Sequence, residues 1–226
     1  MKLLAVAIVA VGGFWFWQHE RHAAMEHRLG AVASELAGRP VHVRCQGVVA
    51  ELIDISDRTG DVQFPDGHPA DTTHLTRAIC CTLESFRSAS SHHRLDCVRS
   101  TDWSGLSAEI VFTSPCARGA QSTVNAITTL AHESMHLRGW MGESQAQCYA
   151  IQEDAWTVVR LGGTVDEGAA VARLALAEQP AMPSEYQSGE CRAGGALDLH
   201  PETPEFPTEA VPQLLPAGLG GPTLQR

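Results

Sequence analysis

Apolar residues recur every three or four positions in the second half of the chain, which is the spacing of helices with one buried face. Residues 122–137 carry this pattern without a glycine or proline, and Gly139 follows, where a helix end favours a residue that tolerates positive φ. Residues 143–161 carry a second such pattern. A capping-box sequence at 164–167 opens a third helix, which extends to about Glu178. The second half therefore predicts three consecutive helices.

Strand-like alternation is found in the first half of the chain. Residues 41–45 alternate between apolar and polar side chains, and residues 48–55 and 62–64 are further strand candidates. An Asp-Arg-Thr-Gly turn at 57–60 separates the last two candidates. The pattern predicts a small sheet that precedes the helices, and hence an α+β domain that is mostly helical.

The middle of the chain has weaker patterning. A helix capped by Thr72 or Thr73 and running to about Ser88 is expected. Residues 89–121 are polar and predict an irregular segment. Within that segment, the run AEIVF at 108–112 suggests an edge strand beside the cleft, along which an extended peptide can pair.

The N-terminal segment, residues 1–17, has one charge, at Lys2, followed by fifteen apolar or glycine residues. This is typical of an export signal or a membrane anchor. The run is short of the roughly 20 residues of a full span, but small residues typical of a cleavage site do not follow it directly. An uncleaved single-pass anchor with an extracytoplasmic domain is therefore expected. The alternative is a secreted chain whose signal is removed.

Three further segments follow from composition. Residues 18–38 predict a helical stalk, expected to pack on the domain or lie on the membrane rather than form a coiled coil. Residues 201–226 contain six of the twelve prolines and predict a disordered tail. The prediction of the stalk helix rests on apolar positions at alternating steps of four and three: Met25, Leu29, Val32 and Leu36. The domain itself is then residues 39–200.

Charge and cysteine content narrow the functional classes. The net charge of −10 and the pI near 5.5 argue against nucleic acid as a partner, because phosphate binding needs a basic surface. Seven cysteines in an exported chain predict disulfides, and the odd count leaves at least one unpaired or intermolecular. We expect Cys148 to pair with Cys191, which would clamp the C-terminal segment onto the domain. Cys80 and Cys81 face different ways on a helix, so one of them is expected to be bridged.

The most informative stretch is the sequence HESMH at 132–136. Residues four apart lie on one face of a helix, so the imidazoles of His132 and His136 can reach one metal ion. Glu133, which is adjacent to the first ligand, is placed to hydrogen-bond a water molecule at the metal. Two ligands and one general base on a single helix indicate the chemistry of a zinc hydrolase.

The residues that follow resemble known metallopeptidases. The run HESMHLRG at 132–139 satisfies HExxHxxG and resembles the opening of the metzincin motif, whose third histidine would fall at position 142, where this chain has glycine. The next residues, Glu143 to Gln147, resemble the ExxAD element of membrane-associated gluzincins. That resemblance implies that Glu143 is the third zinc ligand. Gln147 lies one helical turn after Glu143, and from there we expect it to orient one of the ligands by a hydrogen bond.

The resemblance implies a zincin-type zinc metallopeptidase with a small zincin-like α+β domain. It implies Zn²⁺ held by His132, His136 and Glu143, with Glu133 as general base and a peptide or protein as substrate. Tyr186 is a weaker candidate for a hydrogen bond to the developing oxyanion.

Other interpretations of the same residues remain open. Glu143 is also a residue that the helix dipole favours in a first turn. The domain could be a non-catalytic, zinc-containing binding module of the cell envelope. In the third alternative HExxH is accidental and the helix is scaffold.

Overall fold

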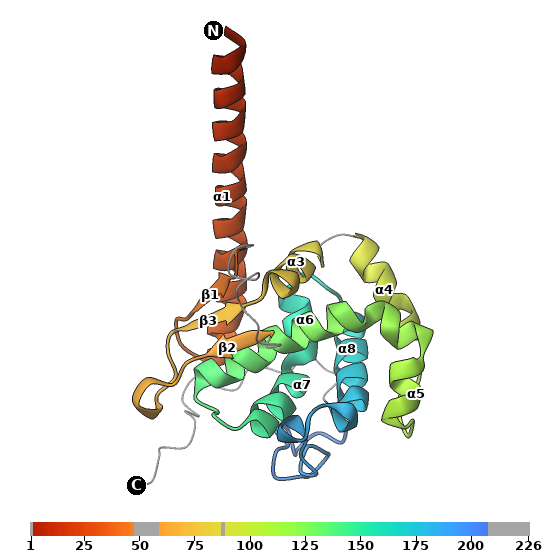
Figure 1. The fold of residues 1–226 in the computed structure, drawn as a ribbon. Coiled ribbons are helices and arrows are strands. Elements are labelled where there is room, and N and C mark those ends of the chain that lie inside the picture. The colour runs from red at the N-terminus through yellow and green to blue at the C-terminus, as the bar shows by residue number, and fades with distance from the viewer. Residues whose placement is uncertain (1, 48–58, 87–88, 208–226) are drawn as a thin grey trace.

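The structure, a computed structural model, describes residues 2–47, 59–86 and 89–207. Helix α1 (Lys2–Ala37) opens the chain, and its N-terminal half projects from the rest of the molecule (Figure 1). Its second half belongs to the hydrophobic core, so the predicted stalk is a helix packed on the domain. The buried α1 residues are Met25, Leu29, Val32, Ala33, Leu36 and Ala37.

The predicted anchor at 1–17 is not decided by the structure, because its side chains lie outside the described residues. In the part of the chain that is described, no helix is both long and apolar enough to cross a membrane.

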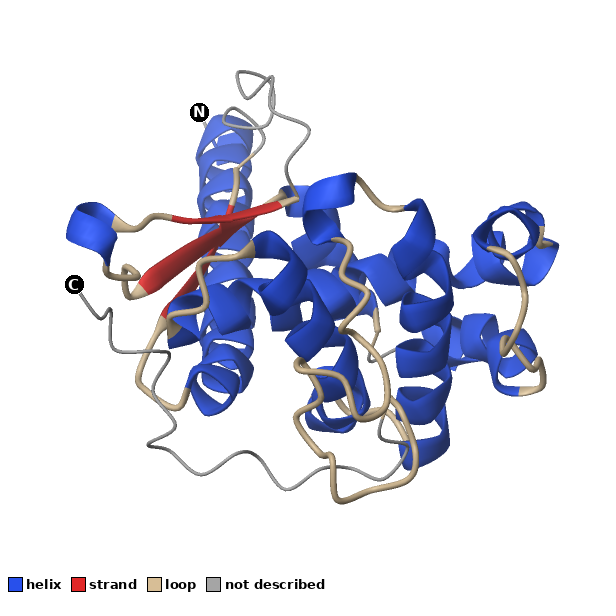
Figure 2. Cartoon of the chain, turned by 90° about the horizontal axis from the view of Figure 1, so that it is seen from below, coloured by secondary structure: helices blue, strands red, loops and turns tan. Residues whose placement is uncertain are grey.

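A three-stranded sheet lies beside α1 on one side of the molecule (Figure 2). Its strand order is β1-β3-β2, with β1 (His42–Cys45) parallel to β3 (Thr72–Leu75) and β2 (Gly60–Val62) antiparallel to β3. The small sheet and the surrounding helices confirm the α+β prediction. The strand expected at 48–55 lies outside the described residues.

The prediction of a helix starting at Thr72 or Thr73 was wrong. Residues 72–75 form β3, and helix α3 (Arg77–Ser85) begins after Thr76, whose hydroxyl accepts a hydrogen bond from the Ile79 N–H. Thr73 and Leu75 are fully buried on one face of β3. Pairing with two distant strands therefore determines the conformation here, and the capping threonine is the next one along the chain.

The two outer edges of the sheet differ. Along the outer side of β1, the N–H of Val41, the residue before the strand, donates to Ser34 Oγ at 3.0 Å, and the Cys45 N–H donates to Glu26 Oε1 at 2.8 Å. Both acceptors come from α1, so this helix covers the β1 edge with its own side chains. Among the described residues, no strand pairs with the outer side of β2. Within the described residues, the β1 edge of the sheet is therefore covered by α1, and the β2 edge has no paired strand.

Residues 89–121, predicted to be irregular, contain two helices and the start of a third. Helix α4 (Ala89–Arg99) buries Leu95 and Val98, and the edge strand predicted at 108–112 is instead helix α5 (Ala108–Thr113). The Ser107 hydroxyl caps α5 by accepting the Ile110 N–H. Because this region is mostly polar, its few buried positions do not form a pattern from which helices could be predicted.

The three helices predicted in the second half are confirmed. Helix α6 (Pro115–Arg138) starts earlier than expected, with a proline in its first turn, where its missing N–H costs nothing. It is followed by α7 (Glu143–Arg160) and α8 (Val165–Glu178), and the capping box that opens α8 is present. The described residues also form three single-turn 3₁₀ helices: η1 (Pro65–Gly67), η2 (Gln179–Ala181) and η3 (Ser184–Tyr186).

Reciprocal hydrogen bonds join the C-terminal ends of α1 and α6. Arg138 of α6 donates to the Leu36 carbonyl of α1 at 3.1 Å, and Arg39 donates to the Leu137 carbonyl of α6 at 3.0 Å. Each arginine supplies a donor to a carbonyl in a last helical turn, where no intrahelical partner exists. These contacts hold the end of α6, and therefore the histidines just before it, against α1.

Three disulfides stabilise the domain, which indicates folding in an oxidising compartment. Cys148 and Cys191 are bonded, as expected, and they hold the C-terminal segment to α7. Gln152 strengthens this attachment, since its amide donates to the Leu197 carbonyl at 2.8 Å and accepts the Leu199 N–H at 2.7 Å. The bridges are Cys45–Cys80, Cys97–Cys116 and Cys148–Cys191, and Cys81 is free and exposed.

Candidate metal centre

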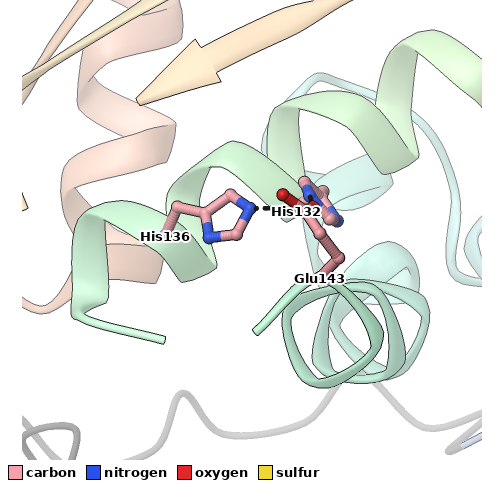
Figure 3. Close-up of side chains that lie close together, drawn as sticks. All are labelled: His132, His136 and Glu143. Carbon is pink, nitrogen blue, oxygen red and sulfur yellow. Dashed lines mark hydrogen bonds and ion pairs between the residues drawn. The ribbon is translucent and has the colours of Figure 1, made fainter. Parts of the chain in front are cut away.

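A sharp turn between two helices brings the HExxH residues and Glu143 together. His132 and His136 lie in the last two turns of α6, which ends at Gly139 with φ 113°. Gly142 precedes α7 as its N-cap, and Glu143 is the first residue of that helix. The glycine-ended turn therefore directs the start of α7 back towards the two histidines (Figure 3).

The three side chains converge on one point. Glu143 Oε2 lies 3.0 Å from His132 Nε2 and 3.3 Å from His136 Nε2. One ligand atom from each residue falls within 4.8 Å of the others, which makes a group able to hold a metal ion. Both histidines are buried, while the Glu143 side chain is 41% exposed. The group is therefore enclosed on the α6 side and accessible from the side of Glu143.

The hydrogen bonds of His136 favour a cation in this group. Its Nδ1 lies 2.6 Å from the Trp140 carbonyl, which can only accept, so Nδ1 carries the proton. A neutral His136 then presents the lone pair of Nε2 to the carboxylate oxygen of Glu143. Two electron pairs that face each other need a positive charge between them. A backbone carbonyl that fixes the outer nitrogen is also the usual support of a metal-binding histidine.

The ionisation states suit the same donor set. The hydrogen bond from His132, together with the nearby His136, lowers the pKa of Glu143 to about 2. Burial lowers the pKa of His136, and the charge of His132 acts in the same direction. At neutral pH the group therefore combines a charged carboxylate with a neutral imidazole, the forms in which these side chains bind metals.

Glu133 belongs to the same turn of α6 but has different surroundings. Its side chain is 5% exposed and lies against Gly60 of β2, and its Oε2 is buried without a hydrogen-bond partner. Burial raises the pKa of Glu133 to about 7, although the charge of His132 and a hydrogen bond from Thr73 oppose the rise. Glu133 is thus separated from the three converging residues and is able to change protonation state near neutral pH.

Tyr186 lies next to one of the histidines, whereas Gln147 is not hydrogen-bonded to the free nitrogen of His132. The ring of Tyr186, carried by η3, lies 5.6 Å from the ring of His132. Gln147 is buried on α7, one turn after Glu143. His132 Nδ1 is buried without a hydrogen-bond partner, so the amide of Gln147 is not bonded to it. The roles proposed for Tyr186 and Gln147 stay predictions.

Sequence reasoning missed three neighbours of the group. They are the Trp140 carbonyl, the ring of Phe64, which lies edge-on to His136 at 5.9 Å, and Gly60, which packs on Glu133. Gly60 and Phe64 come from the strand region far away in the chain, and no local pattern connects them to α6. Trp140 lies in the turn itself, but a backbone acceptor carries no signature in the side chain.

Comparison of the chain with protein-family models, with curated proteins and with solved structures found no match.

Proposed function

We propose that this chain is a zinc metallopeptidase in which His132, His136 and Glu143 hold the zinc ion and Glu133 is the general base. One observation carries the proposal. Ligand atoms from two helices converge within 4.8 Å, while the glutamate between the histidines remains outside that group. This is the separation of roles that metal-assisted hydrolysis requires.

The donor set supports zinc as the ion. Two imidazole nitrogens and one carboxylate oxygen are typical of catalytic zinc sites, which leave the fourth position open. Magnesium and calcium prefer sites made of oxygen ligands alone. The exposed side of Glu143 is the side from which water and substrate can reach the ion.

Zinc bound here would act as a Lewis acid towards the substrate carbonyl and the attacking water. Glu133 accepts the proton of that water and delivers it to the leaving amine. A pKa of about 7, raised by burial, suits a group that must both take up and release a proton near neutral pH. Tyr186, whose ring lies 5.6 Å from that of His132, would donate a hydrogen bond to the developing negative charge.

The sheet supports a peptide as the substrate. β2 is the edge strand that passes over Glu133, and its outer side is open among the described residues. An extended peptide that adds to such an edge uses its backbone groups, so the reacting carbonyl is presented by hydrogen bonds independent of sequence. The edge strand predicted at 108–112 does not exist, and β2 takes the place proposed for it.

The proposed location combines two observations. The apolar run at 1–17 precedes a domain with three disulfides. A single-pass N-terminal anchor with the domain outside the cytoplasm accounts for both, and cleavage of the run would give a secreted form.

The proposal is tested with the full chain purified in detergent. Elemental analysis of the wild type is expected to find one zinc per chain, and Glu143→Ala is expected to lose it, since two ligands remain. Glu109→Ala, an exposed glutamate on α5, is the matched control and keeps the zinc. Glu133→Gln is expected to keep the zinc and lose cleavage of a peptide library. Cleavage that survives in zinc-loaded Glu133→Gln would refute the assigned base.

A further inference from the structure

Gly60 of β2 packs directly against the carboxyl group of Glu133, which lies between α6 and the sheet. A Cβ atom built on Gly60 would lie 2.5 Å from Glu133 Oε1 and 2.6 Å from both Cδ and Cγ of the same side chain. Real Cβ atoms do not approach other atoms so closely. Gly60 is not among the glycines with positive φ. The requirement for glycine here therefore comes from space and not from backbone conformation.

The strand register explains why this glycine faces α6. Alternate residues of a strand share a face, so Gly60 points to the same side as Val62, which is buried. Val62 pairs with Thr73 of β3, whose side chain lies next to Glu133 and whose hydroxyl donates to the Asp61 carbonyl at 3.1 Å. The two strands thus contact Glu133 at two points.

We infer that Gly60 is a positioning residue for Glu133. Because Gly60 has no side chain, β2 lies directly on the carboxyl group and fixes its direction relative to His132, His136 and Glu143. The end of a glutamate side chain can rotate, so Gly60→Ala displaces the carboxyl group and leaves the strand in place. The catalytic part of this inference rests on the proposed function, whereas the packing does not.

The packing is tested by a double-mutant cycle on the metal-free full chain. Gly60→Ala is expected to lower Tm by several degrees in the wild type and to have almost no effect beside Glu133→Ala, which vacates the space. Gly119→Ala is the matched control, because a Cβ at that position of α6 meets nothing within 4 Å. Equal losses of Tm in the two backgrounds would overturn the inference.

The catalytic consequence is tested on the zinc-loaded protein with a peptide that the wild type cleaves. Gly60→Ala is expected to keep its zinc and its KM but to lose about 10- to 100-fold in kcat, since a displacement of about 1 Å has this effect on an oriented group. An unchanged kcat would overturn the positioning role. If the wild type cleaves no peptide, the proposed function fails, and the Tm cycle still decides whether Gly60 fixes Glu133.

Discussion

Glu143 and Glu153 belong to the same helix, α7, but their carboxyl groups have opposite surroundings. Glu143 is the first residue of the helix and faces two imidazole nitrogens, and the hydrogen bond from His132 holds its pKa near 2. Glu153 lies in the middle of the helix, and both of its oxygens are buried without a hydrogen-bond partner. Burial raises the pKa of Glu153 to about 7, although the charge of Arg138 opposes the rise.

The two glutamates show that burial of a carboxyl group and convergence of ligand atoms around it have different effects. Burial alone makes the charge of Glu153 costly, and the group responds by holding its proton. At Glu143 the neighbouring nitrogens favour the charged form, and the carboxylate remains partly accessible. A buried acid therefore does not mark a possible ligand site by itself, whereas the convergence of several ligand atoms on one point does.

The largest expected effect comes from removing residues 1–38. This deletion removes six buried residues of α1 together with the Leu36 carbonyl that accepts a hydrogen bond from Arg138, whose charge lowers the pKa of Glu153. Loss of so much core exceeds the 5–15 kcal/mol by which domains are stable. Thermal unfolding followed by circular dichroism should show no cooperative transition. Deletion of residues 1–18 is the control, and a cooperative transition in fragment 39–226 would contradict the expectation.

The second-largest expected effect is stabilisation by zinc, which should depend on Glu143 and not on Glu153. At a zinc concentration of about 1,000 times Kd, binding to the native state adds about 4 kcal/mol to the free energy of unfolding. We expect this gain in the wild type and in Glu153→Gln, but not in Glu143→Ala, because only Glu143 faces the histidines. Chemical denaturation with zinc and with a chelator measures the gain. An equal gain in Glu143→Ala would mean that Glu143 does not contribute to zinc binding.

The pH dependence of stability should depend on Glu153. Its pKa is about 7 in the native state, above the ordinary value of 4.5, so the native state binds the extra proton between these values. Stability from this group is therefore complete below about pH 4.5 and falls as pH rises through 7, by about 3 kcal/mol. In Glu153→Gln this loss should disappear. Urea denaturation at pH 5 and pH 8 measures it, and identical losses in variant and wild type would exclude Glu153 as the cause.

The smallest effect concerns the neighbour of Glu153. Thr128 of α6 donates to Asp154 Oδ2 at 2.7 Å, while Asp154 Oδ1 has no hydrogen-bond partner. Thr128→Val removes the donor and should cost about 1–2 kcal/mol in the free energy of unfolding. Thr113→Val, at an exposed position of α5, is the matched control and should cost less. Equal values in the two variants would mean that Asp154 does not depend on this hydrogen bond.

The parts of the fold that the sequence predicted are those determined locally. The spacing of His132 and His136, the glycine that ends α6 and the acidic residue that opens α7 are all close in sequence, so the group that could hold a metal ion was predictable from one short stretch. The capping box of α8 is equally local. In each case a hydrogen bond or a ligand distance depends on residues within one or two helical turns.

The parts that could not be predicted depend on partners far away in the chain. Thr73 and Leu75 are in a strand because β1 and β2 pair on either side of β3. Residues 108–112 include the adjacent β-branched residues Ile110 and Val111, yet the Ser107 cap and burial of Val111 make the segment helical. Gly60 lies on Glu133 for a reason of tertiary packing that no sequence pattern records.

The cover that Ser34 and Glu26 place on β1 has a consequence for assembly between molecules. Exposed strand edges are where protein chains polymerise, by adding backbone to backbone. Growth at β1 would have to break two hydrogen bonds to α1. Addition of a strand at β1 is therefore opposed by α1, whereas no strand among the described residues pairs with the outer side of β2.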